Sequence, residues 1–133
     1  MAEEIMSARE QAFIIVFEKS FNSDVSFDEL IEFSAGCENI TVSEKAKKMI
    51  AGIRDNFDEI DGNIENHLNK WKMNRISKVA LAALRTGVYE LVFAKSAPVG
   101  VIVNESVNLC KKYGTDEDKS FVNGVLGSVA RDM

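Results

Sequence analysis

Apolar side chains recur every three or four positions along most of the chain, which is the period of helices with one buried face. No segment alternates apolar and polar residues in the manner of a half-buried strand. The period predicts about seven helices, at 4–21, 27–36, 44–58, 61–71, 75–94, 98–113 and from 116 toward the C-terminus. We therefore expect an all-α fold, with the helices packed as one bundle or as two small bundles.

Short polar side chains mark several of the expected helix starts, because they can accept a hydrogen bond from the first turn. The expected N-caps are Ser26, Ser43, Asn74 and Thr115. The helix after Asn74 is apolar almost all round, so we expect 75–94 to be a central helix that is covered on several sides. The break near Asp61 and Gly62 is either a bend or a turn, and the pattern leaves both open.

Length and composition narrow the class of protein. With 133 residues, 46% of them hydrophobic, and a single proline, the chain fits one folded domain over 1–133. No apolar run approaches the roughly 18 residues of a membrane span, and the acidic N-terminus differs from a secretory signal. We therefore expect a cytoplasmic protein with no membrane partner.

The formal net charge of −5 argues against one broad function class. A protein that binds nucleic acid without sequence preference is normally basic, because neutralising phosphates supplies its affinity. A nucleic-acid role here therefore requires a local basic patch, a shape-specific site or a basic partner.

The residue patterns offer little catalytic or metal-binding chemistry. His67 is the only histidine, and it lies on the apolar side of a predicted helix, where a structural role is commoner than catalysis. Cys37 and Cys110 are far apart, match no metal spacing and are expected to be buried free thiols. Phosphate-binding and nucleophile-elbow motifs are absent. We therefore expect a protein that is not an enzyme and that carries no cofactor or metal.

Two stretches have the composition of recognition surfaces. The first combines one aromatic ring with basic side chains, and its residues are Lys70, Trp71, Lys72, Arg75 and Lys78. The simpler interpretation, which we favour, places Trp71 in the core with the lysines as its solvated flank.

The second stretch is a helix–turn–helix over 99–126. Lys111, Lys112 and Tyr113 end one helix, Phe121 and Asn123 lie early in the next, and a tight turn is expected to bring them together. Lysines neutralise phosphates, aromatic rings stack on unpaired bases, and an amide can bind a base edge. The alternative is that Phe121 is core, Tyr113 plugs a helix end and the acidic turn only complements the helix dipole. The spacing supports both equally.

Four segments of the C-terminal half match a known family pattern: VALAALRTGVYEL at 79–91, Pro98 with VIVNESV at 101–107, LCKKYG at 109–114 and FVNGVL at 121–126. Through these residues the C-terminal half resembles the NusB family of transcription antitermination factors. The N-terminal half matches in its helical layout and in Ala8-Arg9-Glu10. The resemblance implies an all-α fold of two small helical bundles and no enzymatic activity.

The resemblance also implies partners. Family members pair with NusE, a small-subunit ribosomal protein, and the pair binds the single-stranded boxA element of nascent ribosomal RNA transcripts. The implied role is that of an RNA-bound adaptor in the RNA polymerase antitermination complex, which prevents premature termination.

The family's functional residues can be carried over to matching positions of this chain. With Lys111 and Lys112 of the second stretch added, they form one set that is expected to face RNA and one that is expected to face the partner protein. The RNA-facing residues are Arg9, Lys111, Lys112, Tyr113, Glu117, Phe121 and Asn123. The residues implied for contact with NusE are Phe17 and Glu18 on the first helix.

The N-terminus departs from the family pattern. Arginines usually precede the Ala-Arg pair, but Ile5, Met6 and Ser7 stand there, and the first thirty residues carry seven acidic against two basic residues. We therefore expect weak RNA binding by the chain alone, with NusE supplying affinity. Ile5 and Met6 favour an apolar contact instead, such as a homodimer. The alternative function is a helical protein-interaction module with little or no intrinsic RNA binding.

Overall fold

A computed structural model describes residues 6–37 and 41–133, and every regular element in these ranges is a helix. The α-helices are α1 (Ala8–Lys19), α2 (Phe27–Cys37), α3 (Glu44–Asp55), α4 (Phe57–Glu65), α5 (Lys78–Val88), α6 (Val99–Tyr113) and α7 (Asp116–Arg131). A 3₁₀ turn, η1 (Met73–Arg75), precedes α5, and a π-helical turn, η2 (Tyr89–Ala94), follows it. The predicted all-α class is confirmed.

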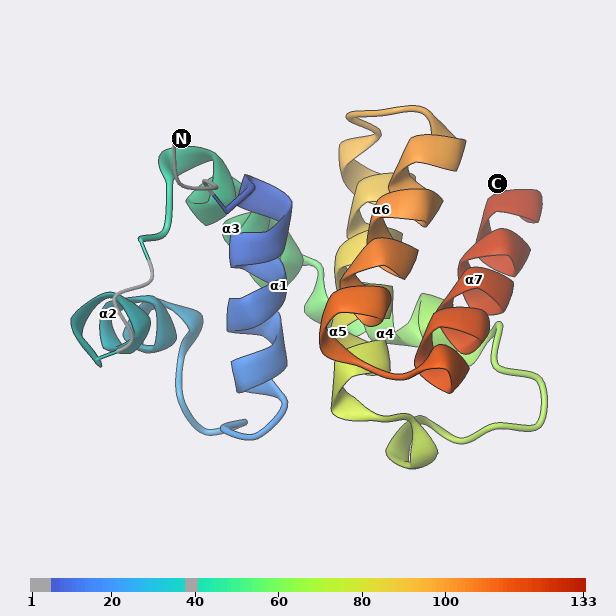
Figure 1. The fold of residues 1–133 in the computed structure, drawn as a ribbon, viewed down its shortest axis with the longest axis horizontal. Coiled ribbons are helices and arrows are strands. Elements are labelled where there is room, and N and C mark those ends of the chain that lie inside the picture. Colours follow the sequence, from blue (N-terminus) through green and yellow to red (C-terminus); the bar gives the residue numbers. More distant parts are fainter. Residues whose placement is uncertain (1–5, 38–40) are drawn as a thin grey trace.

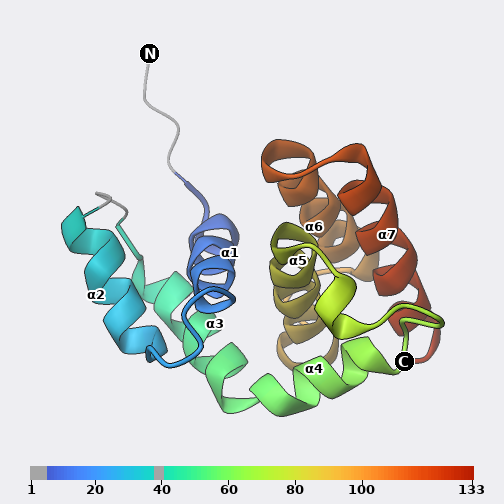
Figure 2. The same cartoon turned by 90° about the horizontal axis from the view of Figure 1, so that it is seen from below.

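The helices form two groups that meet at α5 (Figure 1). In the first group α1 packs against α2 and α3, and in the second α6 and α7 pack against each other and against α5. Helix α1 also packs against α5, and α4 runs beneath the second group, where it contacts α5 and α7 (Figure 2). The expected pair of small bundles is therefore present.

The central helix is buried along nearly its whole length. Every residue from Ala80 to Val88 is buried, as the all-round apolar pattern predicts. Gly87 lets α6 and α7 come close, because a methyl group at this position would lie 2.8 Å from Leu126 Cδ1 and 2.9 Å from Ser106 Oγ. The glycine is therefore a packing requirement of the second bundle.

Several local predictions are correct because the cap chemistry is local. The Ser43 and Ser26 hydroxyls accept hydrogen bonds from the backbone N–H groups of Ala46 and Glu29. Thr115 and Asp118 form a reciprocal capping box at the start of α7.

Other boundaries were predicted wrongly. The central helix begins after Ser77, whose hydroxyl accepts a hydrogen bond from Ala80 N, and Asn74 lies in the 3₁₀ turn instead of capping the helix. The predicted 61–71 helix is α4, which starts after Asn56 and ends at Glu65, so Gly62 lies inside it. Asn69 then adopts a left-handed conformation with φ of 58°, which turns the chain away from a helical path.

The first helix begins later than expected. Ser7 caps it by accepting a hydrogen bond from Glu10 N, so Met6 precedes the helix. Ile5, which the sequence suggested as a self-association contact, lies outside the described residues, and so does the side chain of Cys37.

Replacing Gly87 with alanine should destabilise the fold. The added methyl group overlaps Leu126 and Ser106, and overpacking of a core typically costs about 1–3 kcal/mol. Gly62→Ala is the matched control, because a methyl group there meets no described atom within 4 Å, and it should stabilise α4 by about 0.5–1 kcal/mol. Urea unfolding of the two variants tests this, and equal effects would contradict the packing role of Gly87.

Candidate nucleic-acid interface

The last turn of α6 is attached to the first turn of α1 through one carboxylate. Lys112 Nζ donates to Glu10 Oε2 at 2.6 Å, and the Tyr113 hydroxyl donates to the same oxygen. The Tyr113 ring packs on Phe13 with a centroid distance of 5.3 Å, and Lys112 Nζ lies 5.4 Å from the Tyr113 ring centroid. Two predicted RNA-facing residues therefore lie together, and both contact Glu10.

This contact shifts the protonation equilibria of its members. Burial tends to raise the pKa of Glu10, but the hydrogen bonds from Lys112 and Tyr113 outweigh it, so the pKa lies below its usual value. Burial, with the hydrogen bond to Glu10, raises the pKa of the Tyr113 phenol. Glu10 is therefore ionised at neutral pH and faces the end of α6 as a carboxylate.

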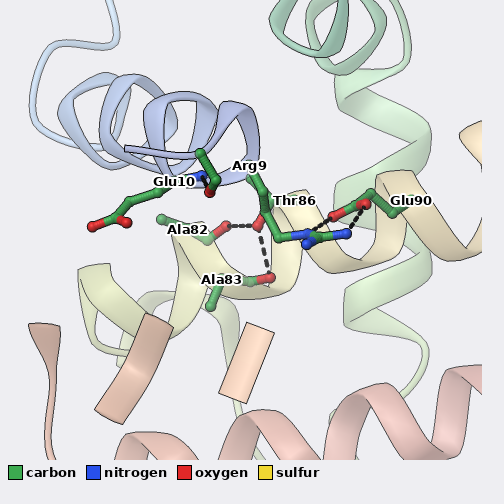
Figure 3. A network of polar contacts seen from close by, with 7 residues as sticks. Arg9, Glu10, Ala82, Ala83, Thr86 and Glu90 are labelled. Carbon is green, nitrogen blue, oxygen red and sulfur yellow. Dashed lines mark hydrogen bonds and ion pairs between the residues drawn. The ribbon is translucent and has the colours of Figure 1, made fainter. Parts of the chain in front are cut away.

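Arg9, the neighbour of Glu10, is held by a different partner. Its Nε and Nη2 donate to the two carboxylate oxygens of Glu90 at 2.6 and 2.7 Å (Figure 3). The Glu90 side chain is 4% exposed and that of Arg9 is 21% exposed, so this is a largely buried, bidentate ion pair. The hydrogen bond to Glu90 raises the pKa of Arg9. Most of the charge of Arg9 is thus compensated within the protein.

The other predicted residues lie along the start of α7. Glu117 is exposed in its first turn, and Phe121 is half-buried with its ring against Trp71 at a centroid distance of 5.7 Å. Asn123 is exposed, and two residues correspond to about 200° around a helix, so it lies across the buried stripe from Phe121. The turn therefore does not gather all predicted residues into one cluster: Tyr113 pairs with Phe13, and Phe121 pairs with Trp71.

The prediction that Trp71 belongs to the core is wrong. Its residue surface is 58% exposed, and it borders a groove of about 680 Å³ whose other walls include Arg75, Ser77, Glu117 and Phe121. The helix whose period suggested burial ends at Glu65, so the period no longer applies at Trp71. The pairing with Phe121 joins residues fifty positions apart, and the only sequence signal for exposure was the pair of flanking lysines.

The predicted partner-facing residues lie on the last turns of α1. Phe17 is half-buried and packs on Phe21 at a centroid distance of 5.0 Å, and Phe21 is 60% exposed. Glu18 accepts a hydrogen bond from the Ser34 hydroxyl at 2.7 Å, which ties α1 to α2. An exposed aromatic surface therefore exists beside both residues.

The two candidates for catalytic chemistry, His67 and Cys110, occupy structural positions. His67 lies between the Asn63 carbonyl oxygen and Asp132 Oδ2, at 2.7 and 2.6 Å. Cys110 is a buried free thiol, as expected, and burial raises its pKa to about 12. Within the described ranges no three His, Cys, Asp or Glu side chains are placed to hold a metal, and no helix could span a membrane.

Glu10→Gln should lower the free energy of unfolding by about 1 kcal/mol at pH 7, because the charged hydrogen bonds from Lys112 and Tyr113 are weakened. The pKa of Glu10 is depressed in the folded state, so its contribution is present above the ordinary carboxyl pKa and is lost as the pH falls through the folded pKa. Urea unfolding from pH 7 downward should show the variant and the native chain converging. A difference that stays constant with pH would contradict this role.

The chain is similar to one family of known proteins over nearly its whole length. The NusB family model matches residues 6–131. The transcription antitermination protein NusB of Clostridium novyi is 39% identical over 129 residues, covering 93% of this chain and 96% of that protein. The NusB of Lysinibacillus sphaericus is 36% identical, covering 90% of this chain and 91% of that protein.

Solved structures give the same family. Thermotoga maritima NusB is 34% identical with a TM-score of 0.82, covering 94% of this chain and 89% of that one. A chain from a crystal structure of the antitermination factors NusB and NusE in complex with double-stranded RNA is 32% identical with a TM-score of 0.83, covering 95% of each chain. This chain therefore belongs to the NusB family of transcription antitermination factors, which are not enzymes.

Proposed function

We propose that this chain, as a single domain over 1–133, is an RNA-binding adaptor that acts together with NusE. The pair binds a boxA-type single-stranded element of nascent ribosomal RNA transcripts and prevents RNA polymerase from terminating early. The observation that carries the proposal is the similarity, over 95% of each chain, to a chain in a complex of NusB and NusE with double-stranded RNA. Such a role places the protein in the cytoplasm of a bacterium, where transcription occurs.

The RNA surface that we propose follows the end of α6 and the start of α7. Lys111 and Lys112 are exposed in the last turn of α6, where they can neutralise phosphates. Tyr113 and Phe121 offer aromatic rings to unpaired bases, and the exposed Asn123 can bind a base edge. Glu117 and Arg9 complete the proposed set.

Internal ion pairs should weaken binding by the chain alone. Arg9 is paired with Glu90 and Lys112 with Glu10, so these cations are already partly compensated before RNA arrives. The chain also carries a net charge of −5, which repels phosphates at long range. A basic partner that extends the binding surface would offset both effects, which is the part we assign to NusE.

We place the NusE contact on the aromatic end of α1. Phe17 and the exposed Phe21 can supply the apolar anchor that interfaces usually contain, and Glu18 lies next to them. The carboxylate of Glu18 suits a basic ribosomal protein.

The second candidate function is a protein-interaction module without intrinsic RNA binding. Ile5, Met6 and Ser7 stand where family members carry arginines, and this departure favours it. The apolar pair Ile5 and Met6 also suits a homodimer. The two functions differ in whether RNA binds at all.

Titration of a fluorescently labelled boxA RNA, with and without NusE and at several salt concentrations, tests the proposal. We expect weak binding by the chain alone and much tighter binding with NusE, both weakening as salt rises. Absence of RNA binding in every condition would exclude the RNA role and leave the interaction module.

Glu10→Gln should strengthen RNA binding by about two- to five-fold, because it removes a carboxylate from the surface that faces the phosphates. Glu44→Gln is the matched control, since it removes one exposed carboxylate from the start of α3, a helix that contributes no residue to the proposed RNA surface. Anisotropy titrations at low salt measure both. Equal effects of the two variants would show that only net charge matters and that Glu10 does not border the RNA site.

A further inference from the structure

Trp71 and Phe121 form an aromatic cleft beside a basic segment. The proposed function assigns no role to the loop that carries Trp71 or to the basic side chains of that loop. We propose that this cleft stacks an unpaired base of the bound single-stranded RNA, while Lys70, Lys72 and Arg75 contact the adjoining phosphates. The inference rests on the proposed RNA-binding function and assigns a second part of the RNA path to this loop.

The exposure of Trp71 is the first observation. A tryptophan normally buries most of its surface, because its removal from water is strongly favourable, yet 58% of Trp71 is exposed. Its ring meets Phe121 at 72° with a centroid distance of 5.7 Å, so the two rings form a corner. A base stacked on one ring of such a corner places its edge against the other ring.

The loop that carries Trp71 is anchored on both sides. The buried residues Leu68 and Ile76, 2% and 8% exposed, enclose the segment, and the left-handed turn at Asn69 directs the chain outward between them. The Ser77 hydroxyl donates to Asp118 Oδ1 at 2.7 Å, which fixes the end of the loop to the start of α7. In Figures 1 and 2 this yellow-green segment runs beside α7. The cleft is therefore largely formed before a ligand arrives.

Charge is the second, independent observation. No acidic residue occurs between Glu65 and Glu90, whereas Lys70, Lys72, Arg75 and Lys78 fall within nine positions. Lys70, Lys72 and Arg75 line a hollow of about 400 Å³ around Trp71, next to the larger groove. This is the local basic patch that a chain with a net charge of −5 needs for binding nucleic acid.

The opposite wall of the groove is acidic, and one of its three carboxylates, that of Asp118, is engaged in hydrogen bonds. Asp118 accepts hydrogen bonds from Ser77 and from Thr115 N, and Asp116 lies 3.9 Å from Lys119. Glu117 is exposed and can accept a hydrogen bond from the exocyclic amino group of a base. An aromatic corner with phosphate-binding cations on one side and an acceptor on the other fits a nucleotide of single-stranded RNA, because bases in a duplex stay stacked.

The single tryptophan makes the first test direct, because all indole fluorescence comes from Trp71. Titrating the chain with NusE and unlabelled boxA RNA should quench this fluorescence over the concentration range in which labelled RNA binds. Quenching by NusE alone, with no further change on adding RNA, would make the cleft a protein contact and overturn the inference.

The second test separates stacking from charge. Trp71→Ala should weaken RNA binding by about five- to one-hundred-fold and leave the salt dependence unchanged, because a stacking platform contributes no counterion release. Lys72→Ala should reduce the slope of log K against log salt concentration by about 0.7. Phe33→Ala is the matched control, since Phe33 is a 52% exposed aromatic residue on α2, and it should bind RNA as the native chain does.

The outcomes distinguish the two levels of the proposal. If the native chain binds RNA and Trp71→Ala binds it as tightly as Phe33→Ala, the RNA function holds and the cleft has no part in it. If the native chain binds no RNA with NusE, the proposed function itself fails. Thermal melting of Trp71→Ala and Phe33→Ala should agree, which excludes unfolding as the cause of weaker binding.

Discussion

A buried carboxylate near the end of the central helix governs how the two bundles meet. Glu90 is enclosed by protein, and an unpaired charge in such a place would cost several kcal/mol, about 3–5 when one partner of a buried pair is removed. The bidentate pair with Arg9 meets this requirement, and it brings the first turn of α1 against η2. Glu10, the next residue, then reaches the end of α6. Two adjacent residues of opposite charge thus attach the start of α1 to η2 and to the end of α6.

The sequence predicted those parts of the fold that depend on neighbours within one helical turn. Ser43 and Thr115 were identified as caps because the hydrogen bonds that they make are local. Asn74 was predicted as the cap of the central helix because it has a capping side chain, but the helix starts after Ser77, and that start depends on where Ile76 enters the core. The burial of Trp71 was predicted wrongly for a related reason. The apolar spacing continues to Trp71 in the sequence, although the helix itself has already ended.

The sequence predicted which residues belong to the candidate site better than it predicted how they are arranged in space. Lys112 and Tyr113 were singled out from charge and aromatic character, but their shared partner, Glu10, lies more than a hundred positions away and left no local signal. Phe121 and Asn123 are close in sequence, yet the helix separates them by about 200°. Which faces of α6 and α7 remain open depends on packing against α1 and on the Trp71 loop, and that packing is a property of the whole chain.

The double attachment of α1 has a consequence for local opening. Helix α1 is held by α5 and by α6 as well as by α3, whereas α2 packs chiefly on α1. Parts of a protein that share many contacts exchange their amide hydrogens together, and parts with few contacts exchange first. Helix α1 should thus form one cooperative unit with the second bundle, although it belongs to the first by position in the chain, and α2 should open independently as the least protected helix of the described residues.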